Sequence, residues 1–105
     1  QNGDGNSSTI DQGGANNSAE VDQNGASHSS SIDQSGEDNF ADVDQSGSMS
    51  SALVDQSGTN SEARIAQSGG SGNSSSITQE TNRLGAQTIQ TGSGNSSTIS
   101  QSSLT

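Results

Sequence analysis

The sequence predicts an all-β fold, a β-solenoid of the cross-β type with two strands in each rung of about 22 residues. Three observations predict it. Glutamine recurs at intervals of eleven residues, the positions shared between repeats lie two residues apart, and a glycine follows most of the glutamines by two positions. A fixed period indicates stacked units, spacing two is the period of a β-strand, and glycine is typical of turns.

The glutamines divide residues 1–105 into the half-repeats of a single repeat domain, with no separate domains. One extra residue enters before Gln79, after which the spacing of eleven resumes. The half-repeats end at Gln1, Gln12, Gln23, Gln34, Gln45, Gln56, Gln67, Gln79, Gln90 and Gln101.

Each strand is predicted to begin six positions before a glutamine, so the first complete one is Asn6–Gln12 and the last is Asn95–Gln101. Positions spaced by two point to one face of a strand, which here is the inside. The β-branched core column comprises Ile10, Val21, Ile32, Val43, Val54, Ile65, Ile77 and Ile99, with Thr88 as its polar member. The asparagine column comprises Asn6, Asn17, Asn39, Asn73 and Asn95, with His28, Ser50, Ser61 and Leu84 as exceptions.

Glycine at the second position after glutamine is expected to permit the positive φ of a turn that ends each strand. These turn residues are Gly3, Gly14, Gly25, Gly36, Gly47, Gly58, Gly69 and Gly92. The segment from Gln67 to Asn73 is one residue longer than its counterparts, which predicts a bulged arc there.

Two classes of half-repeat alternate, one richer in serine and isoleucine and the other in alanine, so one rung is strand, turn, strand, turn. Nine strands make about four and a half rungs. In such a stack, equivalent residues of successive rungs lie directly over one another. We therefore expect each glutamine and asparagine amide to bond to the amides above and below it.

Composition alone is typical of a disordered chain, because hydrophobic residues are 21%, the one aromatic is Phe40 and the net charge is -10. The repeat instead indicates order maintained by hydrogen bonding. Two arginines exclude charge-driven binding to nucleic acid, and no apolar run is long enough to insert into a membrane. A single histidine without a supporting constellation argues against an enzyme.

The unit Gln12-x-Gly14-x-x-Asn17-x-Ala19-x-x-x-Gln23 resembles the curlin repeat, and it recurs from Gln34 to Gln45. The resemblance covers nearly the whole chain. It implies a secreted bacterial subunit that polymerises into curli-type extracellular amyloid fibres of the biofilm matrix, with roles in adhesion and cell aggregation. It also implies glutamine and asparagine ladders as structural sites, and a nucleator and a secretion machinery as partners.

The terminal strands carry the repeat without a capping sequence, so both ends are expected to expose open strand edges that template pairing. Because the two ends are complementary, the chain itself is the predicted partner, in a head-to-tail homopolymer. The polymer ends are Asn6 and Gln12 at one edge and Asn95 and Gln101 at the other. Five strands of one class and four of the other leave a half-rung unmatched, which predicts residues upstream of Gln1 or a flanking tail that fills the gap.

The acidic residues form outward columns, with Asp11, Asp33 and Asp55 in one and Asp22 and Asp44 in another. They are interpreted either as a solvated face that slows premature assembly or as weak calcium sites, and no other cofactor is expected. His28 is expected to replace an amide in its column and to make that rung sensitive to pH. The alternatives to a fibre subunit are a monomeric calcium- or ice-binding solenoid, or a repeat segment of a larger adhesin.

Overall fold

The computed structural model describes residues 1–102, and within them the chain forms nine β-strands and no helix, so no helix there could cross a membrane. The strands are β1 (Ser7–Gln12), β2 (Ser18–Ala26), β3 (Ser29–Gln34), β4 (Phe40–Ser48), β5 (Ser51–Gln56), β6 (Glu62–Ser68), β7 (Ser74–Gln79), β8 (Gly85–Thr91) and β9 (Ser96–Gln101). The predicted all-β solenoid is confirmed.

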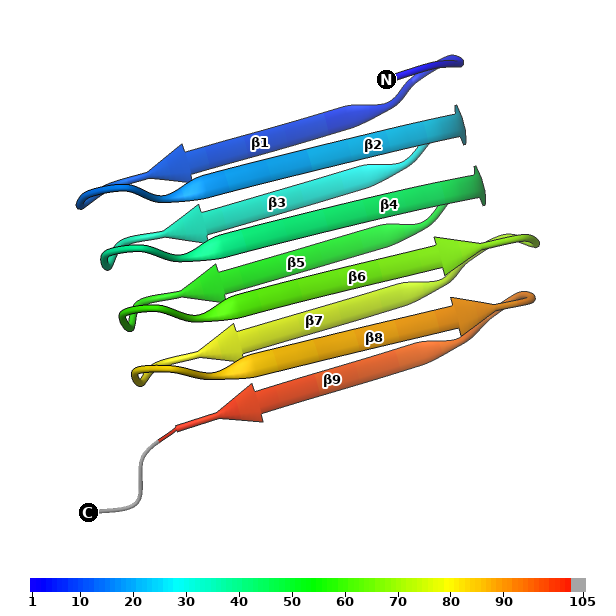
Figure 1. Ribbon diagram of the computed structural model, residues 1–105. Helices are drawn as coiled ribbons and strands as arrows, with labels where there is room; N and C mark the ends of the chain where they lie inside the picture. Colours follow the sequence, from blue (N-terminus) through cyan, green and yellow to red (C-terminus); the bar gives the residue numbers. More distant parts are fainter. Residues whose placement is uncertain (103–105) are drawn as a thin grey trace.

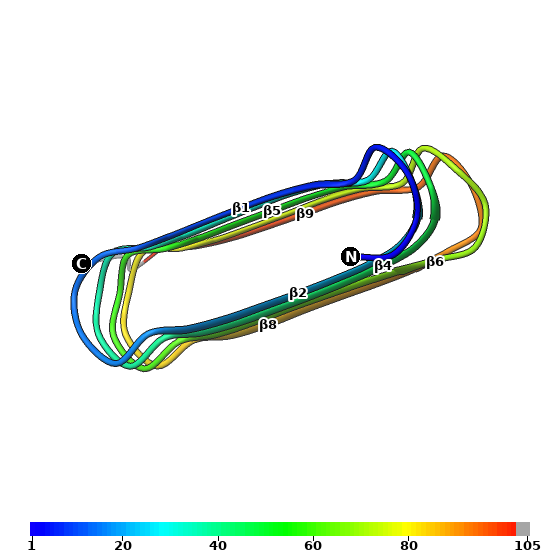
Figure 2. The ribbon, with the colours of Figure 1, turned by 90° about the horizontal axis from the view of Figure 1, so that it is seen from above.

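The strands form two sheets, each made of parallel strands, and the two sheets face each other, as Figures 1 and 2 show. One sheet has five strands in the order β1-β3-β5-β7-β9, and the other has four in the order β2-β4-β6-β8. Each strand pairs with the next but one, with Gln12 opposite Gln34 and Gln23 opposite Gln45. One circuit of the chain therefore climbs by one strand, and the coil is a flattened tube with extents of 40 × 24 × 12 Å.

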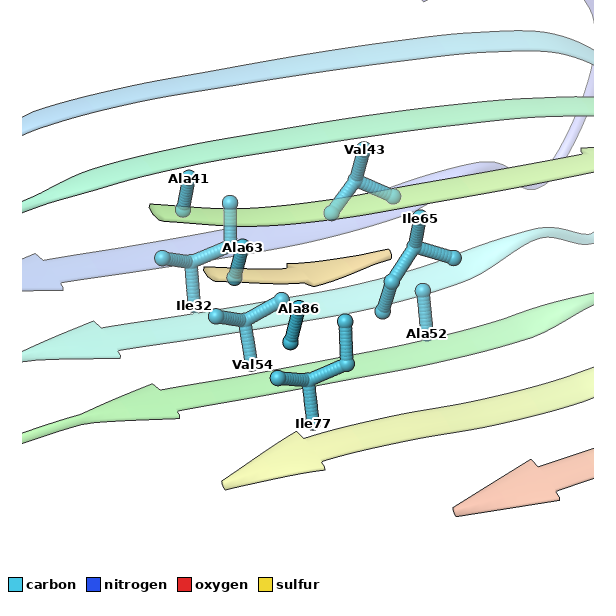
Figure 3. Packing of buried hydrophobic residues seen from close by; sticks show 9 residues of the cluster. All are labelled: Ile32, Ala41, Val43, Ala52, Val54, Ala63, Ile65, Ile77 and Ala86. Atoms are coloured by element: carbon cyan, nitrogen blue, oxygen red, sulfur yellow. The ribbon is translucent and has the colours of Figure 1, made fainter. Parts of the chain in front are cut away.

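Side chains alternate between the inside of the tube and the solvent because successive residues of a strand point to opposite faces. In β5 the residues alternate strictly between exposed and buried positions. Val54 and Ile65 are both fully buried between the two sheets, where Val54 lies beside Ala63 and Ile65 lies beside Ala52 (Figure 3). Small and branched residues fill the narrow lumen. The spacing of two in the sequence therefore determines which residues form the core.

The predicted bulge lies in the arc between β6 and β7. The pairing offset changes there from 22 to 23 residues, because Gln67 lies opposite Gln90. Gly69, Gly70 and Gly72 all have positive φ, which allows the longer arc to turn within the same space between strands. Figure 2 shows this arc further out than the arcs that follow β2 and β4.

The prediction that glycine ends each strand is wrong for β2 and β4, which continue through Gly25 and Gly47. The prediction of a positive φ holds for Gly3, Gly14 and Gly69, and for Gly25, Gly47 and Gly92. It is wrong for Gly36 and Gly58, which are absent from the left-handed region although they occupy the same column. A different constraint, described below, explains the glycine at those two positions.

Candidate polymerisation surfaces

The glutamine side chains form two hydrogen-bonded ladders along the axis of the solenoid. Within each ladder, Nε2 of one glutamine donates to Oε1 of the glutamine one rung later, at 2.8 Å for both Gln12 to Gln34 and Gln34 to Gln56. The bonds continue through the bulge from Gln56 to Gln79 and from Gln67 to Gln90. Every ladder bond has the same direction, with the donor on the N-terminal side.

The same amides also join the two sheets. Nε2 of Gln34 donates its second hydrogen across the lumen to the carbonyl oxygen of Ser18, at 3.0 Å, and Gln56 does the same to Phe40 at 3.1 Å. The acceptor lies at the start of the strand sixteen residues earlier in nearly every rung. Six of these glutamines are fully buried, and their two donors and their acceptor are all used. This cross-lumen bond was not predicted from the sequence, since its acceptor is a backbone atom.

The ladders end with complementary atoms. At the C-terminal end, Gln101 uses one Nε2 hydrogen on the carbonyl of Gly85, and Gln90 uses one on Ser74, so each has a second hydrogen that no other described residue accepts and that a further ladder bond could use. At the N-terminal end, no donor within residues 1–102 reaches Oε1 of Gln12 or Gln1. A second copy stacked head to tail would place acceptors against donors, whereas a head-to-head contact would place acceptor against acceptor.

Among the described residues, the side-chain amides of the asparagines do not bond to one another, so the prediction of an amide-to-amide asparagine ladder is wrong. Oδ1 of Asn17 accepts the backbone N–H of Asn39 at 3.0 Å, and Nδ2 of Asn17 donates to the carbonyl of Gly36 at 2.8 Å. Asn39 repeats this with the N–H of Ser61 and the carbonyl of Gly58. The shorter side chain reaches the backbone of the next corner and ties one rung to the next there.

The glycine column leaves room for these bonds. A Cβ built on Gly36 would lie 1.6 Å from the carbonyl oxygen of Gly58, the atom that accepts the amide of Asn39. A Cβ on Gly14 would lie 2.0 Å from the carbonyl oxygen of Gly36. Glycine is therefore required by the close approach of the next rung, even at Gly36 and Gly58, where φ does not demand it.

Four residues replace asparagine in its column, and the three polar ones among them reproduce its hydrogen bonds to different extents. The buried His28 accepts the N–H of Ser50 at Nδ1, as asparagine does, but its Nε2 lies 3.3 Å from the carbonyl of Asn24 in its own rung instead of contacting a carbonyl of the next rung. Ser61 accepts from Leu84 and donates to Thr81 through one hydroxyl. The hydroxyl of Ser50 is buried without a partner among the described residues.

A second left-handed position, missed in the sequence, precedes the asparagine column in every rung. It holds residues with φ between 51° and 74°. The sequence signal was present, because most residues there are of the types that tolerate this conformation. The column comprises Gly5, Asn16, Ser27, Asp38, Met49, Asn60, Gly72, Arg83 and Gly94.

Within residues 1–102, both ends of the solenoid are open. Ile10 in β1 is 44% exposed, although its column partners Ile32 and Val54 are buried. Val21 and Ile99, the core residues next to the ends, are only partly buried. At the C-terminal end the lumen opens as a hollow of about 490 Å³ lined by β8 and β9. The inward residues of each end strand lack the rung that buries their equivalents elsewhere.

The acidic columns lie as expected on the outer faces. Asp11, Asp33 and Asp55 are paired along one sheet, and Asp22 is paired with Asp44 on the other. Among the described residues, no three side chains of the metal-binding types are grouped to hold a cation. Burial raises the pKa of the Asp55 carboxyl, and the negative charges of Asp33 and Glu80 raise it further.

One comparison with known proteins gives a match. The family model of the curlin associated repeat matches residues 1–25, 14–47, 36–69 and 50–80, which together cover most of the chain. No curated protein and no solved structure matches the chain.

Proposed function

The chain belongs to the family of curlin associated repeats, and from that premise we propose that it is a structural subunit that polymerises head to tail into an extracellular curli-type amyloid fibre. The family and the solenoid fold are structural rather than enzymatic. The fibre would serve the biofilm matrix, adhesion and cell aggregation, and a nucleator and a secretion machinery would be its further partners.

One observation carries the proposal. The glutamine ladders run in one direction and end with unused donors at the C-terminal edge and unused acceptors at the N-terminal edge. The open edges of β1 and β9 add unpaired backbone groups, which template pairing with another chain. A second copy placed on β9 would extend both the sheet and the ladder without closing a ring, and such a contact generates a filament.

The C-terminal edge offers a test through one backbone N–H. The carbonyls of Asn95 and Gln101 accept from Ser74 and Glu80 of the adjoining rung, so the backbone groups of these alternate residues face β7. Those of Thr98 therefore face the open edge. Thr98→Pro removes a donor that an incoming copy would use and leaves the bonds between β9 and β7 in place.

We expect Thr98→Pro to fold with its β-sheet circular dichroism intact but to form no fibres alone. Because its N-terminal edge is unchanged, it should join a wild-type fibre once at an end that exposes β9 and then block further addition there, so a small molar fraction should stop seeded elongation at those ends. Thr98→Ala keeps the N–H and is the matched control, with elongation close to wild type. Elongation of Thr98→Pro at the wild-type rate, or a wild-type chain that stays monomeric at high concentration, would contradict the proposal.

A further inference from the structure

We propose that Asn24 is a site of spontaneous deamidation, which reacts in the unfolded chain, is protected in the folded solenoid, and once modified prevents β2 from pairing along its whole length. The inference concerns the chemistry of the chain itself and holds for a monomer as well as for a fibre. The sequence contains two Asn-Gly pairs, Asn2-Gly3 and Asn24-Gly25, and the second lies within β2.

The reaction uses the backbone nitrogen that follows the asparagine. The nitrogen of Gly25 loses its proton to hydroxide and attacks Cγ of Asn24, the bond from Cγ to Nδ2 breaks, and the side-chain nitrogen leaves as ammonia after taking a proton from water. One water molecule then opens the succinimide ring. Opening at Cγ gives aspartate, whereas opening at the main-chain carbonyl gives isoaspartate, whose backbone is longer by one methylene. Glycine favours the attack because it has no side chain to hinder it and turns freely.

The folded structure opposes the first step in two ways. The N–H of Gly25 donates to the carbonyl oxygen of Asn2 at 2.8 Å, so the attacking nitrogen is engaged in a hydrogen bond. Asn24 pairs with Ser46 between the parallel strands β2 and β4, which keeps its backbone extended, whereas ring closure requires the backbone to turn until the nitrogen meets Cγ. The side chain of Asn24 is therefore exposed to solvent, but its reaction is blocked until β2 opens.

The isoaspartate product does not fit this position. Gly25 lies opposite Gly47 of β4, and a Cβ built on Gly25 would lie 2.0 Å from the carbonyl oxygen of Gly47 and 2.9 Å from Nε2 of His28. The two rungs therefore leave no space for one additional carbon atom. A methylene inserted before Gly25 would shift it along the strand, away from its partner Asn2, and would displace the arc that leads to His28.

The equivalent positions of the other rungs provide a matched control. The residue that follows the glutamine in the remaining strands of this sheet is Ser46, Ser68 or Thr91, none of which has an amide to lose. Because Ser46 occupies the same position one rung later, serine suits this column. Asn24→Ser therefore removes the reactive amide and leaves the backbone pairing of β2 unchanged.

The first experiment follows isoaspartate at residue 24 by mass spectrometry in an Asn2→Ser background, where Asn24-Gly25 is the one remaining Asn-Gly pair. The protein is incubated at mildly alkaline pH in native buffer and in urea, and a synthetic peptide of residues 20–30 in both buffers corrects for any effect of urea itself. We expect the folded chain to react at least about tenfold more slowly, because its reaction depends on the fraction of time that β2 is open. Equal corrected rates would overturn the proposal.

A second experiment tests the consequence of the modification. Chains aged in urea are diluted into native buffer, and refolding is followed by β-sheet circular dichroism. We expect the refolded fraction to fall as isoaspartate accumulates, with the isoaspartate in the chains that do not refold. Asn24→Ser in the same background should refold fully after the same incubation. Asn24→Asp, made fresh, adds the charge without the longer backbone and should also refold. Isoaspartate chains that refold with the urea midpoint of the unmodified protein would refute the proposal.

Discussion

The glycine and the asparagine of a corner depend on each other. The carbonyl that accepts the amide of Asn39 belongs to Gly58, and it can approach because Gly36 has no side chain. Sequence reasoning assigned this glycine to backbone conformation alone. The two requirements differ in what they tolerate, because a residue such as asparagine can adopt positive φ but cannot remove its Cβ.

Gly36 and Gly85 both lie outside the left-handed region, so replacing them tests whether glycine is required by close approach of the next rung or by backbone conformation. We expect Gly36→Ala to lower the free energy of unfolding by about 1–3 kcal/mol or more, because its Cβ would overlap a backbone oxygen that cannot move without disturbing the next rung. Gly85→Ala has nothing within 4 Å of the new Cβ and should be neutral or slightly stabilising. Urea unfolding followed by circular dichroism measures both, and equal effects would refute the close-approach argument.

Met49 is the least suitable residue in its left-handed column. It has a φ of 51° and is 62% exposed, so little packing compensates for its conformation. We expect Met49→Gly to raise the free energy of unfolding by about 1 kcal/mol, because glycine adopts this region without the steric cost that other residues bear. Urea unfolding is again the measurement. Ser31→Gly, on the outer face of β3, is the control and should be destabilising, and a loss of stability in Met49→Gly would contradict the argument.

The strands were predictable and the corners were not. Spacing of two and a period of eleven place Val54 and Gln56 inside because a strand offers only two faces, and the sequence decides between them. Asn17 and His28 bond to backbone atoms, some in the neighbouring rung and some in their own, and side-chain chemistry alone does not reveal which atom will lie within reach. The open ends were predicted from the absence of caps, but the direction of the ladder required atomic positions.

Each element stacks on a near copy of itself, so an unfavourable contact is repeated along its column. The acids of β1, β3 and β5 lie in register, and Asp55 is the one whose pKa is raised by burial and by neighbouring charge. The folded state therefore holds this proton more tightly than the unfolded chain. Its contribution to the free energy of unfolding is fully present below the ordinary pKa and is lost as pH rises through the raised folded value.

Asp55→Asn tests this contribution. We expect the variant to be more stable than wild type at pH 7, because it carries no partly desolvated charge beside Asp33 and Glu80, and the difference should shrink as the pH is lowered toward 4. Asp4→Asn, in the exposed first arc, controls for the change in net charge. The measurement is the urea midpoint at each pH. A difference between Asp55→Asn and wild type that grows on acidification would have the wrong sign.

Charge is distributed unevenly over the whole molecule. Eleven of the twelve acids lie between Asp4 and Glu62, so the C-terminal end is nearly neutral. In a head-to-tail contact, β9 presents Thr98 and Ser100 beside Asp11, whereas a head-to-head contact would oppose Asp11 with a second acidic edge. The asymmetry thus favours the same polarity as the glutamine ladder.

Salt should therefore speed assembly by screening the net charge of -10. We expect seeded elongation to be several-fold faster at 0.15 M than at 0.01 M salt, because the Debye length falls from about 30 Å to about 8 Å. A variant with Asp22→Asn and Asp44→Asn should show a smaller ratio of the two rates, since it removes one stacked acidic pair. Elongation that slows with added salt would show that attraction between charges, rather than repulsion, governs the contact.

The continuous coil of the chain has a mechanical consequence, because successive strands of each sheet are joined by the chain that passes through the other sheet. Under tension along the fibre, neighbouring rungs inside a subunit are connected by covalent bonds as well as hydrogen bonds, whereas a junction between two copies is held by non-covalent bonds alone. Breakage would therefore occur between subunits and leave intact chains on either side. Each break would create one new end of each kind, so stirring or flow would multiply the sites of growth.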